Sequence, residues 1–275
     1  MKTVLSIHSQ VAGARVGNSV AAFAMERLGV RVLALPTTLL GRRPDRGAPG
    51  GGPVAAETLA SLIDALEADG QLPRVDAVLS GYVAAPEQAE IILDAVSRVK
   101  AANPAAFYAC DPVLGDDGRF YVGPAIRDAV VEKLAPAADW LTPNAFEASA
   151  LTGVEIASLE DALSVARKLG KPVLISSIPH EARIAALFWT PEGAWAFETE
   201  ILKDAARGAG DLFAALFLAR TLSGETHASA LASAMGAVYD VIARSPPNGD
   251  LDLPAAQEML IAPRTQPRAI ALEQI

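Results

Sequence analysis

One turn and the helix that follows it organise this sequence: Arg207-Gly208-Ala209-Gly210-Asp211, then Leu212-Phe213-Ala214-Ala215-Leu216-Phe217-Leu218-Ala219. Two glycines separated by one residue let the backbone approach a ligand closely, and the apolar run after them predicts a buried helix. A helix that opens on such a turn presents unpaired N–H groups at the positive end of its dipole. The stretch therefore predicts an anion site of the kind that binds phosphate.

Asp211 lies at the mouth of this predicted anion site. A carboxylate does not help to bind phosphate, but it can take the proton from a hydroxyl group that attacks phosphate. The alternative is that Asp211 only caps the helix, since acidic residues are common at helix starts. The first interpretation requires that the carboxylate faces the site and that the neighbouring N–H groups have no protein partner.

The length allows one large domain or two small ones, and α/β folds often reach this size as one domain; the charge argues against a nucleic-acid partner. The chain has 275 residues, of which 51% are hydrophobic, and a mean hydropathy of +0.28. Its net charge of -9 and pI of about 4.9 argue against nucleic acid. The single cysteine, Cys110, is expected in the core, and it excludes an internal disulfide. No signal peptide or membrane span is evident, so we expect a cytoplasmic protein without a membrane partner.

Short apolar runs alternate with longer amphipathic segments, as in α/β proteins. The predicted strands are residues 4–7, 31–35, 77–79, 107–110 and 173–175. The predicted helices are residues 18–28, 57–68, 87–100, 159–169 and 229–243. This alternation predicts a mostly parallel sheet covered by helices on both faces, and a hairpin over residues 185–197 predicts an antiparallel edge.

Polar turns follow several of these strands: His8-Ser9-Gln10, Ser80-Gly81-Tyr82, Asp111-Pro112-Val113, Thr142-Pro143-Asn144 and Ser176-Ser177. Ligands of open α/β sheets bind beyond the carboxyl ends of strands, so these turns should converge near Asp211. Oxygen atoms of Asp111, Asn144 and Glu147 could hold Mg²⁺ there. The alternative is ordinary turn chemistry, with Glu147 in the first turn of a helix after Asn144.

Other motifs narrow the choice of nucleotide-binding fold and of catalytic residues. A P-loop signature is absent from the sequence, and Phe213 holds the place of the third glycine of the dinucleotide fingerprint. The histidines, His8, His180 and His227, do not cluster in sequence and are interpreted as non-catalytic, although His8 lies at the predicted ligand edge. Residues 41–53 are nearly all Gly, Pro and Arg, which predicts neither helix nor strand but a lid or a surface loop.

These motifs closely resemble the pyridoxal kinases of the ribokinase-like superfamily over most of the chain. Residues 6–11 and 16–19 are similar to the opening of that family, and residues 142–147 to its metal and nucleotide motif. Residues 76–82, 99–104 and 110–115 resemble further family motifs, and residues 208–211 the Gly-x-Gly-Asp motif of the superfamily. The resemblance implies a three-layer α/β/α sandwich in a single domain (1–275), with a lid loop (41–53), a C-terminal tail (262–275), no separate lid domain and a homodimeric assembly.

The implied activity is ATP-dependent phosphorylation of the 5′-hydroxymethyl group of pyridoxal, which gives pyridoxal 5′-phosphate and ADP. Asp211 would be the base, and Gly208, Ala209 and Gly210 the anion hole. Ser9 would bind the pyridine ring and Val11 would line the pocket. The remaining implied roles are Asp111, Thr142 and Glu147 for Mg²⁺, and Asp111, Thr142, Asn144, Ser176 and Ser177 for the nucleotide; a monovalent-cation requirement stays open.

Two departures from the family keep alternatives open. Gln10 stands where the family commonly has histidine, and residues 39–46 replace a loop that is usually aromatic and polar. Both lie on the substrate side, so ATP and Mg²⁺ are better supported than pyridoxal itself. The alternatives are a kinase of the same fold for another ring alcohol, such as hydroxymethylpyrimidine, and a non-catalytic protein that binds the vitamer or the nucleotide.

Overall fold

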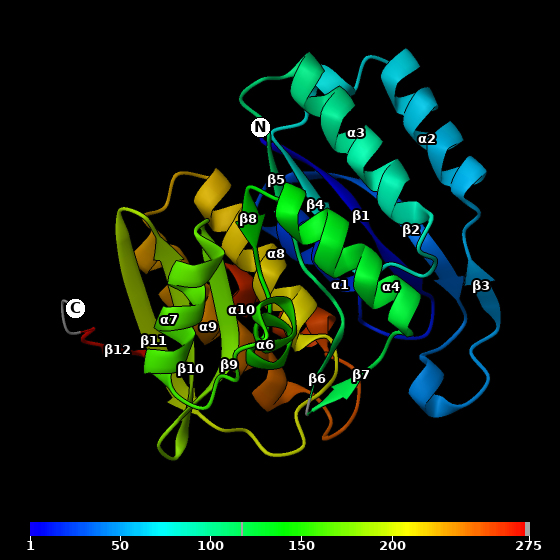
Figure 1. Ribbon diagram of the computed structural model, residues 1–275. Coiled ribbons are helices and arrows are strands. Elements are labelled where there is room, and N and C mark those ends of the chain that lie inside the picture. Colours follow the sequence, from blue (N-terminus) through cyan, green and yellow to red (C-terminus); the bar gives the residue numbers. More distant parts are fainter. Residues whose placement is uncertain (117, 273–275) are drawn as a thin grey trace.

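The computed structural model describes residues 1–116 and 118–272 and contains a ten-stranded sheet in the order β12-β11-β10-β9-β8-β5-β4-β1-β2-β3 (Figure 1). Its centre is parallel and consists of β1 (Thr3–Val11), β2 (Arg31–Leu40), β4 (Ala77–Ser80), β5 (Phe107–Cys110), β8 (Trp140–Leu141) and β9 (Val173–His180). The predicted parallel sheet is confirmed. Strands β2 and β9 run longer than predicted, because each continues past an irregularity in its pairing.

Antiparallel strands flank both ends of this centre: β3 (Gly51–Pro53), β10 (Arg183–Thr190), β11 (Gly193–Glu200) and β12 (Arg268–Ile270). Strands β10 and β11 form the predicted hairpin. The expectation that residues 41–53 form neither helix nor strand is wrong, because η1 (Pro44–Arg46) is a 3₁₀ turn and β3 pairs with β2. Backbone pairing needs no side chain, and glycine and proline are tolerated on an edge strand.

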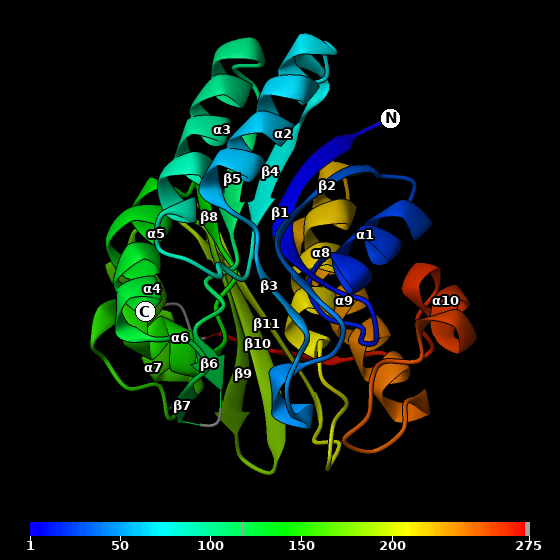
Figure 2. The ribbon, with the colours of Figure 1, turned by 90° about the vertical axis from the view of Figure 1, so that its right-hand side faces the viewer.

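Helices cover both faces of the sheet and make three layers (Figure 2). One layer contains α2 (Ala56–Ala68), α3 (Gln88–Ala102), α4 (Pro124–Ala129), the π-helical turn η3 (Val130–Leu134), α5 (Ala135–Ala137), α6 (Ala145–Thr152) and α7 (Leu159–Leu169). The other contains α1 (Asn18–Arg27), α8 (Ala209–Leu222), α9 (His227–Arg244) and α10 (Leu253–Ile261). The small elements η2 (Leu72–Arg74), β6 (Gly115–Asp116) and β7 (Arg119–Phe120) complete the described chain.

Side-chain alternation along the strands builds two hydrophobic cores. On β1, Leu5 and Ile7 belong to the core beneath α2–α7, whereas Val4 belongs to the core beneath α1 and α8–α10. Successive side chains of a strand point to opposite faces. The parity of Val4 therefore directs Ser6 and His8 toward α1 and α8.

Aromatic packing fixes the position of α8 on the sheet. Phe217 stacks on Trp140 of β8 at a centroid distance of 5.4 Å and lies 4.7 Å from Phe188 of β10. All the side chains from Leu212 to Arg220 are buried. Such aromatic pairs contribute roughly 0.5–1.5 kcal/mol each beyond the area that they bury. The helix that carries Asp211 is thus held rigidly.

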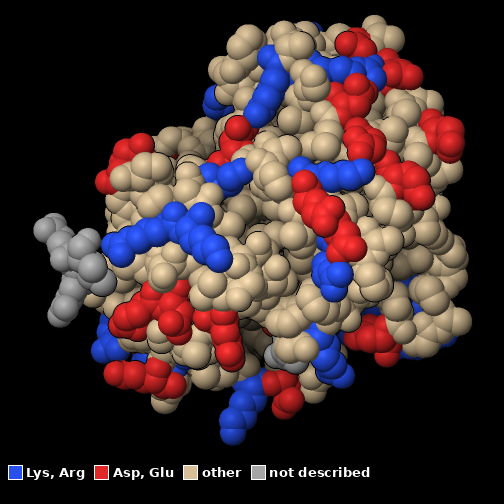
Figure 3. Space-filling view, viewed as in Figure 1, with Lys and Arg blue, Asp and Glu red and all other residues tan. Residues whose placement is uncertain are grey.

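Two further observations concern the surface and the end of the chain. On the face in Figure 3, lysine and arginine side chains are interspersed with acidic ones. Within the described residues, every helix is too short or too polar to cross a membrane. Of the expected C-terminal tail, residues 268–270 pair with β11 as strand β12, and residues 273–275 lie outside the described residues.

Candidate active site

The N-terminus of α8 has the backbone that a close turn requires. Its N-cap residue, Gly208, has a φ of +98°. A Cβ atom at this position would lie 2.1 Å from the carbonyl oxygen of Arg15, so glycine is required by conformation and by space. At Gly210, in contrast, an added Cβ would meet no protein atom within 4 Å. The second glycine therefore leaves an open space at the start of the helix.

The N–H groups at this helix start are available to a ligand. Within residues 1–116 and 118–272, no protein atom accepts a hydrogen bond from the N–H of Gly208, Ala209, Gly210 or Asp211. The first intrahelical bond runs from the N–H of Leu212 to the carbonyl of Gly208, at 3.0 Å. Unpaired N–H groups at the positive end of a helix dipole stabilise an anion.

Asp211 does not cap the helix. It stands three residues after the N-cap Gly208, and its carboxylate oxygens bind His8 and the Gly17 N–H instead of N–H groups of α8. Its Oδ1 lies 3.0 Å from His8 Nε2, and its Oδ2 accepts a hydrogen bond of 2.8 Å from the N–H of Gly17. Burial by itself would raise the pKa of Asp211, but His8 and the Gly17 N–H outweigh it and hold that pKa below its ordinary value. The carboxylate is therefore ionised at neutral pH, as a general base requires.

Asp111, which follows β5, approaches the same point. Ligating atoms of His8, Asp111 and Asp211 all lie within 4.8 Å of one another. Burial raises the pKa of Asp111 well above its ordinary value, and the neighbouring Glu147 and Asp211 carboxylates raise it further. Two buried acids side by side favour a proton or a cation between them.

Thr142 and Glu147 lie beside Asp111 and differ in their hydrogen bonding. The Thr142 hydroxyl oxygen is buried and has no hydrogen-bond partner among the described residues. Glu147 accepts hydrogen bonds from the N–H groups of Leu114 (2.9 Å), Gly115 (3.3 Å) and Asn144 (2.9 Å). Burial outweighs these donors and raises the pKa of Glu147 to about 7. Glu147 thus ties the loop after β5 to the start of α6.

Asn144 is the N-cap of α6 and forms a capping box with Glu147. Its side-chain oxygen accepts from the Glu147 N–H at 2.8 Å, and its Nδ2 donates to the Gly115 carbonyl at 2.9 Å. The interpretation of Glu147 as a first-turn residue of a helix is confirmed. The capping box is a structural role. That Asn144 and Glu147 also bind ligands stays a prediction.

Ser176 and Ser177 form a bulge in β9. Ile175 pairs with Leu187 and Ile178 with Ala185, so both serines oppose the single residue Ala186. Ser177 is exposed and has a φ of +57°, a left-handed conformation that serine rarely adopts. Ser176 bridges to Asn144, which brings the bulge next to the turn after β8.

The predicted substrate side lies at the end of β1. Ser9 is 6% exposed, and its hydroxyl oxygen lies 3.3 Å from His8 Nδ1. Val11 is buried, and its carbonyl accepts a hydrogen bond from the Ser19 hydroxyl. Gln10 donates to that same Ser19 hydroxyl at 3.0 Å, so its amide nitrogen is directed to α1.

Three contributors to this site were not predicted from the sequence: His8, the N–H of Gly17, and the N–H of Tyr82, which donates to His8 Nδ1 at 3.2 Å. The two backbone groups carry no side-chain signal. His8 did have a side-chain signal. Residues 4, 6 and 8 of β1 point to the same face of the sheet, so His8 lies on the face that α8 covers. Only the long-range packing of β1 against α8 identifies Asp211 as its partner.

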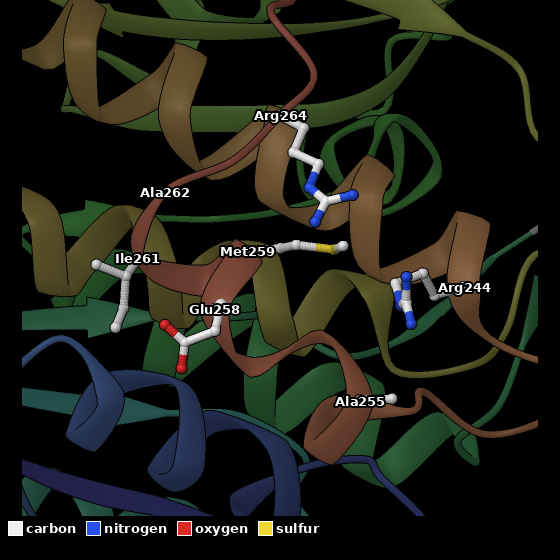
Figure 4. A pocket seen from close by; sticks show the side chains of 7 residues that line it. All are labelled: Arg244, Ala255, Glu258, Met259, Ile261, Ala262 and Arg264. Atoms are coloured by element: carbon white, nitrogen blue, oxygen red, sulfur yellow. The ribbon is translucent and has the colours of Figure 1, made fainter.

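A surface cavity lies away from this site. It has a volume of about 380 Å³ between the end of α9, α10 and the segment after α10, and Figure 4 shows the side chains that line it. None of these lining residues was predicted for the site: Arg244, Ala255, Glu258, Met259, Ile261, Ala262 and Arg264.

Comparisons with known proteins identify the family. Residues 24–255 match the family model described as phosphomethylpyrimidine kinase. Pyridoxal kinase PdxY of Rubrobacter xylanophilus is 42% identical over 272 residues, with 94% of each chain covered, and that of Paraburkholderia xenovorans is 39% identical, with 96% of each covered. Pyridoxal kinase from Leishmania donovani, solved in complex with ADP and ginkgotoxin, superposes with a TM-score of 0.90 at 27% identity, over 99% of this chain and 100% of that one. The chain belongs to the pyridoxal kinase family of the ribokinase-like superfamily.

Proposed function

We propose that this protein is an ATP-dependent pyridoxal kinase that transfers the γ-phosphoryl group of ATP to the 5′-hydroxymethyl group of pyridoxal. One observation carries the proposal: an ionised carboxylate, Asp211, is held beside four N–H groups that no described protein atom engages. The curated relatives named pyridoxal kinase and the Leishmania structure that contains ADP support the same reaction.

In this reaction Asp211 takes the proton of the 5′-hydroxyl group as its oxygen forms a bond to the γ-phosphorus. The bond between that phosphorus and the bridging oxygen breaks, and its electron pair leaves with ADP. The N–H groups of residues 208–211 stabilise the negative charge that is redistributed over the phosphoryl oxygens. Open space at Gly210 lets a phosphate approach the helix start.

The donor atoms next to Asp111 fit Mg²⁺. They are carboxylate and hydroxyl oxygens, which this ion prefers, and the buried Thr142 hydroxyl lacks a described protein partner. We propose Asp111 and Thr142 as the residues that face the ion, with Glu147 holding the loop and offering the one acceptor site that remains on its Oε2. Bound Mg²⁺ would neutralise phosphate charge. Whether a monovalent cation also binds stays open.

We propose the roles of the other predicted site residues from their positions in the structure. Asn144, Ser176 and Ser177, which lie together at the ends of β8 and β9, would contact the nucleotide. Ser9 and Val11 would contact the pyridoxal ring. Residues 41–53 would be the lid, within one kinase domain that spans the chain. We further propose a cytoplasmic homodimer, for which light scattering should give twice the chain mass of 28.5 kDa.

A coupled assay of ADP release tests the function directly. The panel contains pyridoxal, pyridoxine, pyridoxamine and hydroxymethylpyrimidine, each with ATP, in Mg²⁺ and in excess EDTA. We expect Mg²⁺-dependent release with pyridoxal as the substrate of highest kcat/KM. A higher kcat/KM for hydroxymethylpyrimidine would instead support the second candidate, which the description of the matching family model favours. Tight binding of ATP without any product would overturn both in favour of a binding protein.

A further inference from the structure

His8 is one of the most enclosed polar residues of the site. It is 2% exposed, on the face of β1 that packs against α1 and α8. A Cβ atom on Gly81 would lie 2.0 Å from the His8 ring, so only glycine allows the imidazole to occupy this position. The Asn18 side chain donates to the His8 carbonyl at 3.2 Å and to the Leu35 carbonyl at 3.0 Å, which fixes the backbone of β1 at this point.

Backbone donors determine which ring nitrogen carries the proton. Nδ1 of His8 accepts hydrogen bonds from the N–H of Ser9 at 2.7 Å and from the N–H of Tyr82 at 3.2 Å. An N–H group can only donate, so Nδ1 must be unprotonated. The proton of the neutral imidazole therefore resides on Nε2, which donates it to Asp211 Oδ1 at 3.0 Å.

Charged neighbours act on this pair from two elements, Asp211 of α8 and Asp111 after β5. Burial lowers the pKa of His8, but Asp211 outweighs burial and raises it. The second proton of an imidazolium would have to sit on Nδ1, where the Ser9 and Tyr82 N–H groups already point. The neutral ring is the form that satisfies every contact.

Asp211 is thus held by one donor on each oxygen, His8 Nε2–H on Oδ1 and Gly17 N–H on Oδ2. Each carboxylate oxygen has two acceptor sites, so one site on each stays free for a substrate hydroxyl. A donor that binds only the ionised form favours that form and restricts its rotation.

We propose that His8 is a positioning residue that orients Asp211 and keeps it ionised through a fixed Nε2–H tautomer. His8 exchanges no proton in the reaction; Asp211 receives the hydroxyl proton as described above. This inference rests on the proposed function for its kinetic consequences, whereas the tautomer itself can be observed in the resting enzyme.

Two substitutions of His8 separate positioning from packing. In His8→Gln the amide nitrogen reaches about as far as Nε2, so it can still donate to Asp211, whereas the amide of His8→Asn is too short. We expect kcat for pyridoxal to fall about 10- to 100-fold in His8→Asn, with KM for ATP changed less than threefold. The acid limb of kcat/KM should rise by about one pH unit, because Asp211 loses a donor to its ionised form. His8→Gln should recover most of both effects.

Controls make each outcome decisive. His180→Asn, which lies outside the site at the end of β9, should behave as wild type. Thermal unfolding checks that the His8 variants are folded. A wild-type acid limb and kcat in folded His8→Asn would overturn the proposal, as would a His8→Gln variant as impaired as His8→Asn. If the wild type instead releases no ADP with any ring alcohol, the proposed function fails.

Nitrogen-15 NMR of the imidazoles tests the tautomer without turnover. The chain has three histidines, and the signal lost in His8→Gln assigns His8. We expect the pattern of a neutral Nε2–H ring at pH 8.5, a pH chosen to lie well above the ordinary imidazole pKa because Asp211 raises the pKa of His8. An Nδ1–H tautomer of the neutral ring, or an imidazolium that persists at pH 8.5, would overturn the proposal, even if the enzyme phosphorylates pyridoxal.

Discussion

Asp211 is the residue on which the proposed chemistry depends, and two donors hold it. In Asp211→Asn, one of the amide hydrogens must face either the His8 or the Gly17 N–H donor. The variant keeps the size of the side chain but has no ionised oxygen. The substitution therefore removes the base and disturbs its support at the same time.

We expect Asp211→Asn to lower kcat for pyridoxal by 10² to 10⁴, on the order of what a general base contributes. ADP release in saturating MgATP measures the loss. Asp64→Asn, an exposed position on α2 that pairs with Arg98, serves as the control and should keep wild-type kcat. Turnover of Asp211→Asn within threefold of the control would rule out its role as the base.

The raised pKa of Glu147 makes the free energy of unfolding depend on pH. Its pKa in the folded protein is about 7, above the ordinary value of 4.5, because burial disfavours its ionised form. The folded state therefore binds the proton more tightly than the unfolded state does. The stability that this proton contributes is complete below pH 4.5 and is lost as the pH rises toward 7.

We predict that the metal-free protein loses up to about 3 kcal/mol of unfolding free energy through Glu147 between pH 4.5 and 7. In Glu147→Gln this part of the pH dependence should be absent, although the absolute stability will be lower. Urea unfolding from pH 5 to 7.5 in EDTA measures both proteins. Parallel stability profiles for the two would contradict the assignment.

At the scale of elements, the start of α8 contains two glycines with different structural roles. Gly208 adopts a left-handed φ and packs against the Arg15 carbonyl, whereas Gly210 faces open space. The first is required by the fold and the second, we propose, by the ligand. A matched pair of alanine substitutions separates these roles.

Gly208→Ala should lower the unfolding free energy by about 1–2 kcal/mol through its backbone conformation, with a further cost from the Arg15 overlap. Gly210→Ala should keep or slightly raise stability, since alanine favours helix, but should weaken ATP binding because the methyl group fills the phosphate space. Urea unfolding and KM for ATP report the two effects. A Gly210→Ala variant with unchanged kcat/KM for ATP would argue against the phosphate position.

A second element-scale feature ties residues 41–53 to the anion-binding turn. Arg43, 7% exposed, donates to Asp250 Oδ1 at 3.0 Å, and Arg46 donates to Asp250 Oδ2 at 2.7 Å. Asp250 bridges to Arg207, the residue before Gly208. The carboxylate of Asp250 thus binds the predicted lid, and the backbone of the same residue pairs with the segment before α8.

Asp250→Asn should loosen this loop, because Arg43 and Arg46 both lose their ion pair with residue 250 while Arg43 keeps its pair with Asp45, at a cost of about 1 kcal/mol. Trypsin should then cleave after Arg46 at least several-fold faster than in wild type, since cleavage follows local opening. Mass spectrometry of the fragments identifies the site, with Asp64→Asn again as control. Equal cleavage rates would show that Asp250 does not restrain the loop.

At the scale of the whole molecule, the proposed ligands join parts that are distant in sequence. The turns after β1, β5 and β8 and the start of α8 meet at one edge of the sheet. A ligand that binds only the folded protein stabilises it by about 2.7 kcal/mol at 100 times its Kd. Because both helix layers pack on a single sheet, ligand binding should raise the unfolding free energy of the entire domain.

We therefore expect a non-hydrolysable ATP analogue with Mg²⁺ to raise the melting temperature by about 5–10 °C at that concentration. Asp111→Asn should lose the Mg²⁺-dependent part of the increase and keep the rest. Calorimetry with and without EDTA measures both parts. The same Mg²⁺-dependent increase in Asp111→Asn would exclude Asp111 as a residue that faces the ion.

Local patterns were sufficient for most of the architecture. Residues 107–110 and 159–169 were predicted as the strand and helix that β5 and α7 form, because apolar spacing and helix caps are signals within a few residues. Strand β3 was missed because edge pairing with β2 is decided by the partner strand and not by the side chains of residues 51–53.

The sequence by itself determined the alternation of strands and helices, the edge of the sheet where polar turns gather, and the glycine-rich start of α8 with its acid. Only the tertiary structure decided that His8 and the Gly17 N–H hold Asp211, that Glu147 ties two loops, and that Asp250 pairs with Arg43 and Arg46. The physical reason is range. Periodicity and turn chemistry act between residues close in the chain, whereas these contacts join residues such as 8 and 211, which meet only when β1 and α8 pack together.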